Sequence, residues 1–598
     1  MEEQRDEQRE LTVLFYFASD NPLAPLVVSE IKAIKDAGFQ ENTSVLVYFD
    51  PMQKGARSQL LDVNRDRRKI EKTHIGDGAD PFVRNMAEDE VDPEELTPEM
   101  SATLDPKATV TAVESLGSFI QFALKKRTAK NYMLILIGHG MIVGNDSFLP
   151  DDDPISAITL AQLKDLCGMF SEGDKTHLRL LGLHSCSMSS IEVAYQLKGK
   201  ADYMLATQGT MFVNGWPYRQ LLKKTLNQVK RVKQQARQAA RKEKKDEQAA
   251  MAAATVDYDE LIGKLYFLSL YNFTDFITAG YSCDLALCRL NTEKLEQLKS
   301  PLQKLVAALK SELEPRVSLI KDLILLAHWD AQSFWSENYT DLWDFCDCLA
   351  KRCDDAKTGL EILESSGAEA QPIKVDKEKL ATISKLCQVV QDVLAAEHQR
   401  ENPEGIVRYA DNFGTDYQYA HGLSIYFPWC EPLDDQRPTS DSKQSVTEPS
   451  QRVATSKKVM DLYRDYDFTR EFGDDSWFSF LNAYFELTKR APRTDPENTS
   501  YIEIADDLGV NEDAAKRVFE TAKSTFTAGL LKRTPELKKT PDVGGDCTCP
   551  SIKNYPTVMP VKSDRNIRKF SITPRALGAF FTDRPNETVK PEEPDDEQ

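Results

Sequence analysis

Short apolar runs alternate with amphipathic segments through the first part of the chain. The first run, "LTVLFYFASDN", is rich in β-branched and aromatic residues and stops at Ser, Asp and Asn, as buried strands do. Strands of this kind are predicted at 11–21, 43–50, 131–140, 177–186, 201–209 and 421–429. Helical spacing is seen at 22–38, 110–127, 156–170 and from Ser187 onward. The alternation predicts an α/β fold with a mostly parallel sheet flanked by crossover helices.

Other segments follow different patterns. The polar stretch 57–107 predicts a surface excursion, and 292–400 is predicted to be mainly helical, although Pro301 must kink or divide one helix. Residues 476–490 form a last amphipathic helix. Beyond it, a predicted helical hairpin at 491–535 is similar to helix-turn-helix DNA binders. Its mixed charge favours a hairpin that packs against the protein and does not bind DNA.

A basic segment interrupts the α/β pattern. Residues 223–245 carry ten basic side chains and one acidic side chain, and an Ala-rich stretch follows to residue 255. Such a charge run predicts an exposed helix inserted between sheet elements. A protease-accessible linker or an anion-binding arm is the alternative.

Composition limits the classes of function. The 598 residues suggest two to four structural units, and a net charge of −20 argues against nucleic-acid or anionic-membrane binding by the whole chain. The charged start "MEEQRDEQRE" does not resemble a signal peptide, and no apolar stretch is long enough to span a bilayer. We therefore expect a cytoplasmic protein without a membrane partner.

No metal site is predicted from the cysteines. The 11 cysteines are scattered, which indicates mostly reduced, buried thiols. Cys547 and Cys549 supply too few ligands for structural zinc, and the group at 346–353 lacks a matching histidine pair. The acidic loop Asp151–Asp153 offers oxygen ligands suited to calcium, but such loops are usually solvated.

Two predicted strands end in residues that are chemically complementary. One strand ends at His139 and another at Cys186, and functional groups collect at the carboxyl ends of parallel strands. A helix predicted directly after Cys186 would favour its thiolate, and His139 could carry the proton. The backbone N–H groups of Gly140 and Cys186 are candidate oxyanion donors. Spacing alone leaves open a metal ligand or a buried thiol at Cys186.

The same segments resemble the clostripain family of cysteine peptidases, relatives of the caspases. The resemblance rests on the strand followed by Asp-Asn, on "LILIGHG" with its acidic loop, and on "CSMSSIEVAYQLKGKADYMLATQ". "NGWPY" (214–218), "YTDLWDFC" (339–346), "HGLSIYFP" (421–428) and the final "WFSFLNAYFELTK" add to it. It extends from Leu11 to Arg490 and implies a caspase-like fold, a His139–Cys186 dyad and Gly140 as an oxyanion donor.

Two departures from the family concern specificity and maturation. The family commonly has an aspartate two residues before the nucleophile, which helps to bind a basic substrate side chain, whereas this chain has His184. Gln208 and Asn214 are further candidates for the pocket wall. Family members often process themselves after a basic residue in the loop that follows the histidine, but no Lys or Arg occurs between Lys130 and Lys164. A weakened preference for basic residues and a neutral or acidic preference both remain open.

We therefore predict an intracellular, regulated cysteine endopeptidase that forms a thioester intermediate. Its partners would be protein substrates and an activating protease, calcium is a candidate cofactor, and nucleic acid is not expected. The alternative is a protease-derived interaction protein with little activity. The predicted organisation is a disordered 1–10, a peptidase domain at 11–490 containing the 223–255 insertion and the 292–400 helical region, a hairpin at 491–535, and a largely disordered tail at 536–598.

Overall fold

The computed structural model describes most of the chain up to residue 488. The described residues are 8–18, 24–50, 58–63, 89–105, 109–140, 147–152, 155–171, 176–313, 318–335, 337–365, 376–395, 404–432 and 459–488. The predicted hairpin at 491–535, the tail at 536–598, the Cys547–Cys549 pair and Asp153 lie outside these residues.

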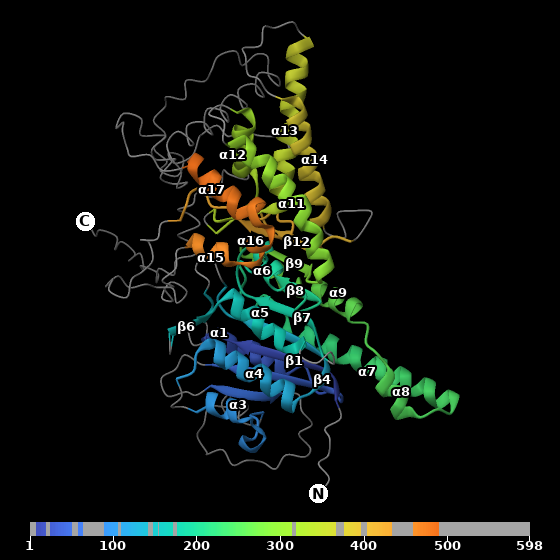
Figure 1. Cartoon of the computed structure of the whole chain (residues 1–598). Coiled ribbons are helices and arrows are strands. Elements are labelled where there is room, and N and C mark those ends of the chain that lie inside the picture. Colours follow the sequence, from blue (N-terminus) through green and yellow to red (C-terminus); the bar gives the residue numbers. More distant parts are fainter. Residues whose placement is uncertain are drawn as a thin grey trace, which may run out of the picture.

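An eight-stranded sheet forms the centre of the molecule, in the order β12-β9-β8-β7-β4-β1-β2-β3 (Figure 1). The strands are β1 (Arg9–Phe17), β2 (Thr43–Phe49), β3 (Gln59–Val63), β4 (Ala129–Ile137), β7 (His177–His184), β8 (Tyr203–Ala206), β9 (Cys283–Arg289) and β12 (Val407–Phe413). The pairs from β2 through β1, β4 and β7 to β8 are parallel. This arrangement confirms the predicted α/β class with a mostly parallel sheet.

The edges of the sheet differ from the expectation. β3 pairs antiparallel with β2, inside the stretch expected to be only a surface excursion. β9 and β12 add two antiparallel strands at the other edge. The predicted strand at 421–429 is the shorter β13 (Ser424–Tyr426), which belongs to a separate three-stranded sheet with β10 (Ser333–Phe334) and β11 (Tyr339–Asp341). β1 begins at Arg9, so the expected disorder of 1–10 is wrong for its last residues.

Each face of the central sheet is covered by its own hydrophobic core. Alternate residues of β1 divide between them: Leu14 and Tyr16 join one core, and Val13 and Phe15 join the other. The first core includes α4 (Ala112–Lys126), α5 (Leu160–Gly168) and α6 (Ile191–Gln196). The second includes α1 (Ala24–Lys35), α7 (Tyr218–Glu243) and α9 (Tyr258–Ser269). Period-two burial is what a strand covered on both faces requires.

A helical region extends beyond the β12 edge of the sheet, at the top of Figure 1. It contains α11 (Thr292–Leu313), α12 (Leu319–Asp330), α13 (Leu342–Ser365), α14 (Lys377–Leu394) and α17 (Trp477–Thr488). Pro301 lies inside α11, which continues through it as one helix. The remaining small elements are α3 (Pro98–Thr103), α8 (Glu247–Ala253), α10 (Phe273–Thr278), α15 (Val459–Asp465), α16 (Asp467–Phe472), β5 (Phe148–Asp152), β6 (Ile155–Ile158) and short 3₁₀ turns.

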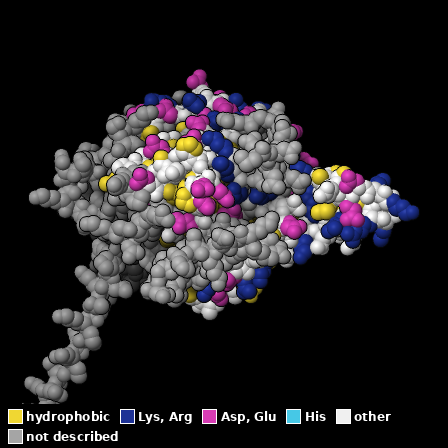
Figure 2. Space-filling view, turned by 90° about the horizontal axis from the view of Figure 1, so that it is seen from below, with side chains coloured by type: hydrophobic (Ala, Val, Ile, Leu, Met, Phe, Trp, Pro, Cys, Tyr) yellow, Lys and Arg dark blue, Asp and Glu magenta, His cyan; other side chains and the backbone are white. Residues whose placement is uncertain are grey.

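The basic segment folds as a helical arm formed by α7 and α8. The arm projects sideways from the sheet, and Figure 2 shows Lys and Arg side chains gathered on it. The amino-terminal half of α7 buries Leu222, Leu226 and Val229 against the sheet. The arm is therefore a docked helix at its base and a solvated one at its tip. Within the described part of the chain, every helix is too short or too polar to cross a membrane.

Candidate active site

Strand pairing brings His139 and Cys186 to the same edge of the sheet. β4 and β7 are adjacent parallel strands, and their last paired residues are Ile137 and His184. His139 and Cys186 each follow that pair by two residues, so both begin loops at the carboxyl edge. Both side chains are partly exposed. The structure thus places the two predicted catalytic residues on neighbouring loops, where parallel sheets carry their functional groups.

Gly140 lies directly against the backbone of Cys186. A Cβ atom built at Gly140 would stand 1.7 Å from the Cys186 carbonyl oxygen and 2.9 Å from its nitrogen. No side chain fits such a gap, because real Cβ contacts are far longer. Glycine at this position allows the loop of His139 to approach the backbone of Cys186. The two candidate oxyanion donors, Gly140 and Cys186, therefore belong to touching segments.

The turn after the thiol corrects one sequence expectation. Helix α6 begins at Ile191 with Ser190 as its N-cap, several residues beyond Cys186, rather than directly after it. Ser187 adopts a left-handed conformation with φ of 55° instead. The predicted support of the thiolate by the helix terminus is therefore wrong. The Met211 backbone N–H, 3.3 Å from the Cys186 Sγ atom, donates to the sulfur in its place.

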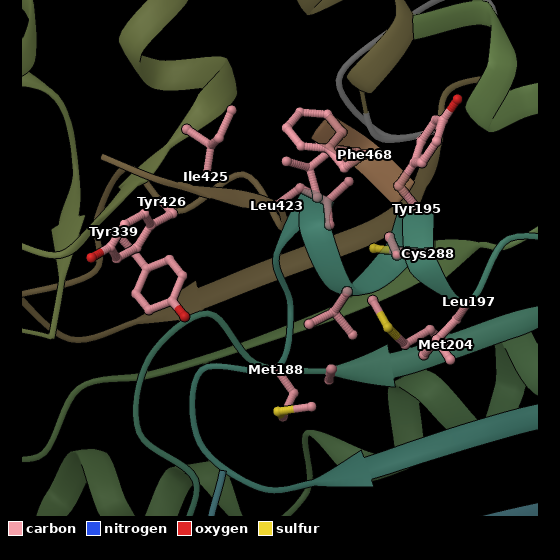
Figure 3. Packing of buried hydrophobic residues seen from close by; sticks show 14 of the residues in the cluster. Met188, Tyr195, Leu197, Met204, Cys288, Tyr339, Leu423, Ile425, Tyr426 and Phe468 are labelled. Carbon is pink, nitrogen blue, oxygen red and sulfur yellow. The ribbon is translucent and has the colours of Figure 1, made fainter. Parts of the chain in front are cut away.

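The loop after β8 supports this turn along its length. We call residues 185–189 the nucleophile turn and residues 207–211 the cradle. Ser187 N–H donates to the Gly209 carbonyl at 3.0 Å, and Ser189 N–H donates to the Thr207 carbonyl at 2.8 Å. Met188 (labelled in Figure 3) belongs to the buried hydrophobic cluster, and its side chain is fully buried. The turn is held by backbone hydrogen bonds on one side and by packing on the other.

His184 is enclosed beneath the site. Its side chain stacks on Trp216, with ring centroids 4.6 Å apart, and it is 2% exposed. Nε2 lies 2.7 Å from the Phe212 carbonyl, and Nδ1 is hydrogen-bonded to the Tyr218 hydroxyl. A carbonyl can only accept, so Nε2 carries the proton and Nδ1 accepts from Tyr218. Burial lowers the pKa of His184 to about 4, which keeps the ring neutral.

The other two predicted pocket residues differ in their surroundings. Gln208 is fully buried, and its side-chain amide bridges the Asp341 carboxylate at 2.9 Å and the Gly422 N–H at 2.8 Å. In this structure Gln208 therefore braces the fold and does not line an open wall. Asn214 is exposed, and its carbonyl accepts a hydrogen bond from the Asn272 side chain at 2.8 Å.

Two buried acidic residues behind the cradle are not predicted by the sequence patterns to belong to the site. Asp284 and Asp341 are 2% and 0% exposed, and each binds residues of the cradle. Asp284 lies within the apolar run "CDLALC" (283–288), and a lone acid inside a strand pattern is the signal that could have found it.

The described residues include no group of three or more His, Cys, Asp or Glu side chains arranged to hold a metal ion. Asp151, from the acidic loop considered for calcium, is a buried residue of β5.

A thiol and an imidazole on adjacent loops at the carboxyl edge of a mostly parallel sheet are the arrangement of cysteine-dependent hydrolases of α/β fold. The family comparison agrees with this class. The model of the clostripain family matches residues 15–419, so this chain belongs to the clostripain family. The resemblance inferred from the sequence motifs is thereby confirmed.

Individual relatives are distant. Clostripain from Hathewaya histolytica is 24% identical over 240 residues, which cover 36% of this chain and 42% of clostripain. The match thus spans less than half of that relative's length. An inactive zymogen C11 protease from Parabacteroides distasonis is similar at 16% identity and a TM-score of 0.40, over 79% of this chain and 99% of that one. A secreted C11 cysteine protease from Bacteroides thetaiotaomicron, bound to an irreversible peptide inhibitor, is similar at 14% identity and a TM-score of 0.41, over 80% and 99%.

Proposed function

We propose that this chain is a cysteine endopeptidase in which Cys186 is the nucleophile and His139 is the acid and base. The observation that carries the proposal is the register of β4 and β7, which sets both residues two positions beyond one paired position. The close contact of Gly140 with the Cys186 backbone supports it, because it joins the two loops into one site.

The chemistry follows from these positions. The Cys186 thiolate attacks the peptide carbonyl carbon, and the N–H groups of Gly140 and Cys186 stabilise the negative oxygen of the tetrahedral intermediate. His139 protonates the leaving amine as the C–N bond breaks, which leaves a thioester on Cys186. His139 then takes a proton from water, and the resulting attack releases the acid and restores the thiol. The Met211 N–H, which donates to Sγ at 3.3 Å, favours the thiolate, whereas the Met211 carbonyl, which accepts from the thiol at 3.7 Å, favours the thiol.

The contacts within the site say less about which substrate side chain is preferred than about which residues carry the chemistry we propose. Family resemblance supports cleavage after Arg or Lys, whereas a neutral, enclosed His184 supplies no charge for a basic side chain. We propose a basic preference that is weaker than the family's usual one. If it holds, His184→Asp should raise kcat/KM for Arg peptides relative to Leu peptides. An unchanged ratio, with efficient Arg cleavage by the wild type, would place His184 outside the pocket.

Active-site labelling tests the central proposal. A biotinylated peptidyl acyloxymethyl ketone should label Cys186 in the wild-type protein and fail to label Cys186→Ala. His139→Ala should slow labelling by roughly 10²-fold or more, because the proton acceptor is lost. Cys430→Ala is a matched control, since Cys430 is another partly exposed free thiol. Equal labelling of Cys186→Ala and the wild type would refute the proposal.

A protease-derived interaction protein is the second candidate. The basic arm is the feature that favours it, because a docked, solvated helix could bind a partner without any chemistry. Absence of labelling across a panel of peptide ketones, in a protein that is folded by circular dichroism, would favour this candidate. An intracellular role and activation by another protease stay predictions for the first candidate.

A further inference from the structure

We propose that Asp284 is a positioning residue: it fixes the cradle and thereby holds the nucleophile turn in its working conformation. This inference rests on the proposed peptidase function, since it concerns a residue that supports the same site from behind. Asp284 hydrogen-bonds the cradle and not the Cys186 sulfur, and its proposed effect is transmitted through backbone hydrogen bonds.

The nucleophile turn needs external support. Ser187 follows the thiol directly and has a positive φ, a conformation that residues with side chains adopt only when their surroundings impose it. The cradle imposes it by three contacts: Gly209 O with Ser187 N, Thr207 O with Ser189 N, and Met211 N with the Cys186 sulfur. Any displacement of the cradle would therefore move the sulfur relative to the histidine loop.

Asp284 holds the cradle where strand pairing stops. The β8–β9 ladder ends at the pair Ala206–Ala286, so Gln208 and Gly209 have passed beyond its backbone hydrogen bonds. The Asp284 carboxylate accepts the Gln208 N–H at 2.7 Å and the Gly209 N–H at 2.9 Å, one with each oxygen. Buried amides need acceptors, and a carboxylate that takes two of them fixes the peptide between them. Gly209 then presents its carbonyl to Ser187.

Asp341 braces the same segment from the other side. It accepts the Gln208 side-chain amide, but it also accepts the backbone N–H groups of His421 and Asp344. Asp341 thus serves α13 and β13 as well, and its removal would disturb several elements. Both hydrogen bonds of the Asp284 carboxylate go to the cradle, which makes Asp284 the better target for substitution.

The electrostatic surroundings of the Asp284 carboxyl agree with its proposed role of holding the cradle. Burial, together with the nearby Asp341 carboxylate, raises the pKa of Asp284 to about 7, although the two cradle amides act to lower it. Tyr266, Tyr417 and Cys283 are the other titratable groups that interact with this carboxyl. Protonation would turn one acceptor oxygen into a donor and loosen one amide. In the wild type this would weaken the support as pH falls through about 7.

The test compares Asp284→Asn with Asp411→Asn. Asp411 is a suitable control because it lies on the neighbouring strand β12 and accepts a hydrogen bond from Tyr266, not from the cradle. Misplacement of a catalytic group by about 1 Å costs roughly 10²-fold in rate, so Asp284→Asn should lower kcat by roughly 10- to 100-fold and leave KM within about 2-fold. Ketone labelling of Cys186 should slow in parallel.

A third variant protects the test against a folding defect. Asp284→Glu keeps the charge and both acceptor oxygens on a side chain that is one methylene longer, and it should give an intermediate kcat. Equal kcat in Asp284→Asn and wild type, a loss confined to KM, or an equal loss in Asp411→Asn would each overturn the inference. Wild-type labelling is independent of all three variants, so failure of this inference leaves the proposed function standing.

Discussion

The two ends of the strands in the central sheet, called here the carboxyl edge and the amino edge, use buried polar groups in different ways. At the carboxyl edge, Asp284 holds a loop whose strained turn carries a partly exposed thiol. At the amino edge, Glu10 at the start of β1 forms a buried ion pair with Lys233 of the arm, 2.8 Å apart. Asn131 and Tyr258 also donate to Glu10. One edge keeps a thiol accessible, and the other pairs a buried carboxylate with a buried ammonium group.

The difference shows what polar burial achieves in each place. Lys233 also donates to the carbonyls of Met251 and Ala254, so its ammonium joins α7, the end of α8 and β1. Such a fully paired charge fixes the arm to the sheet, whereas the acids behind the cradle hold a loop beside the Cys186 thiol. We expect substitutions in the Glu10–Lys233 pair to act on stability and substitutions of Asp284 to act on rate.

The largest expected effect on stability is at the amino edge. Lys233→Ala leaves Glu10 buried without its cation, and breaking such a pair costs about 3–5 kcal/mol. Urea unfolding should show this loss, while kcat of the folded variant should stay within about 2-fold of wild type. The double variant with Glu10→Gln should recover part of the stability. An equal loss in the single and double variants would contradict the pairing.

His184 makes the carboxyl edge sensitive to acid. Its pKa is about 4 in the folded protein against about 6.5 unfolded, so the unfolded state binds the proton first as pH falls. The stabilising effect of the neutral ring is complete above pH 6.5 and should be lost by pH 4, a change of about 3 kcal/mol. His184→Asn should flatten this part of the stability–pH curve. An identical slope in both proteins would show that His184 titrates normally.

Gly140→Ala tests the contact between the loops that carry His139 and Cys186. The added methyl group would collide with the Cys186 carbonyl, so the loops must separate and the oxyanion donors must shift. Loss of one such donor costs roughly 10²-fold or more in kcat. Gly359→Ala is the matched control, because a Cβ atom there meets nothing within 4 Å. Wild-type kcat in Gly140→Ala would mean that the histidine loop can move without consequence.

The smallest effect concerns the tip of the arm. Within α7 and α8, limited trypsinolysis should cut first between Lys242 and Lys245, where Lys244 leaves the helix in an exposed left-handed turn. Cleavage sites near Lys223 and Lys224 should be protected, because neighbouring residues of α7 are buried against the sheet. Mass spectrometry of early fragments would show the order. A higher rate of peptide hydrolysis after the cut would support activation there, and an unchanged rate would refute it.

Much of the framework could be predicted from local patterns. The apolar runs around Leu14, Leu46, Leu134 and Leu181 marked four of the parallel strands, because a strand buried on both faces is apolar at every position. The two chemical residues at the strand ends were visible for the same reason: His139 and Cys186 interrupt apolar runs where a buried strand reaches the surface.

The sequence by itself determined the alternation of elements, the candidate dyad and the membership in its family. Only the tertiary structure decided what supports the thiol. The cradle and Asp284 come to lie behind the nucleophile turn because β8 and β9 follow β7 in the sheet order, and Asp341 reaches the cradle from β11 of the separate three-stranded sheet. The same order enclosed His184 under Trp216 and Gln208 between two acids. Whether a strand is buried can be predicted from its own residues, whereas the hydrogen-bond partner of a loop amide depends on which distant strand becomes its neighbour.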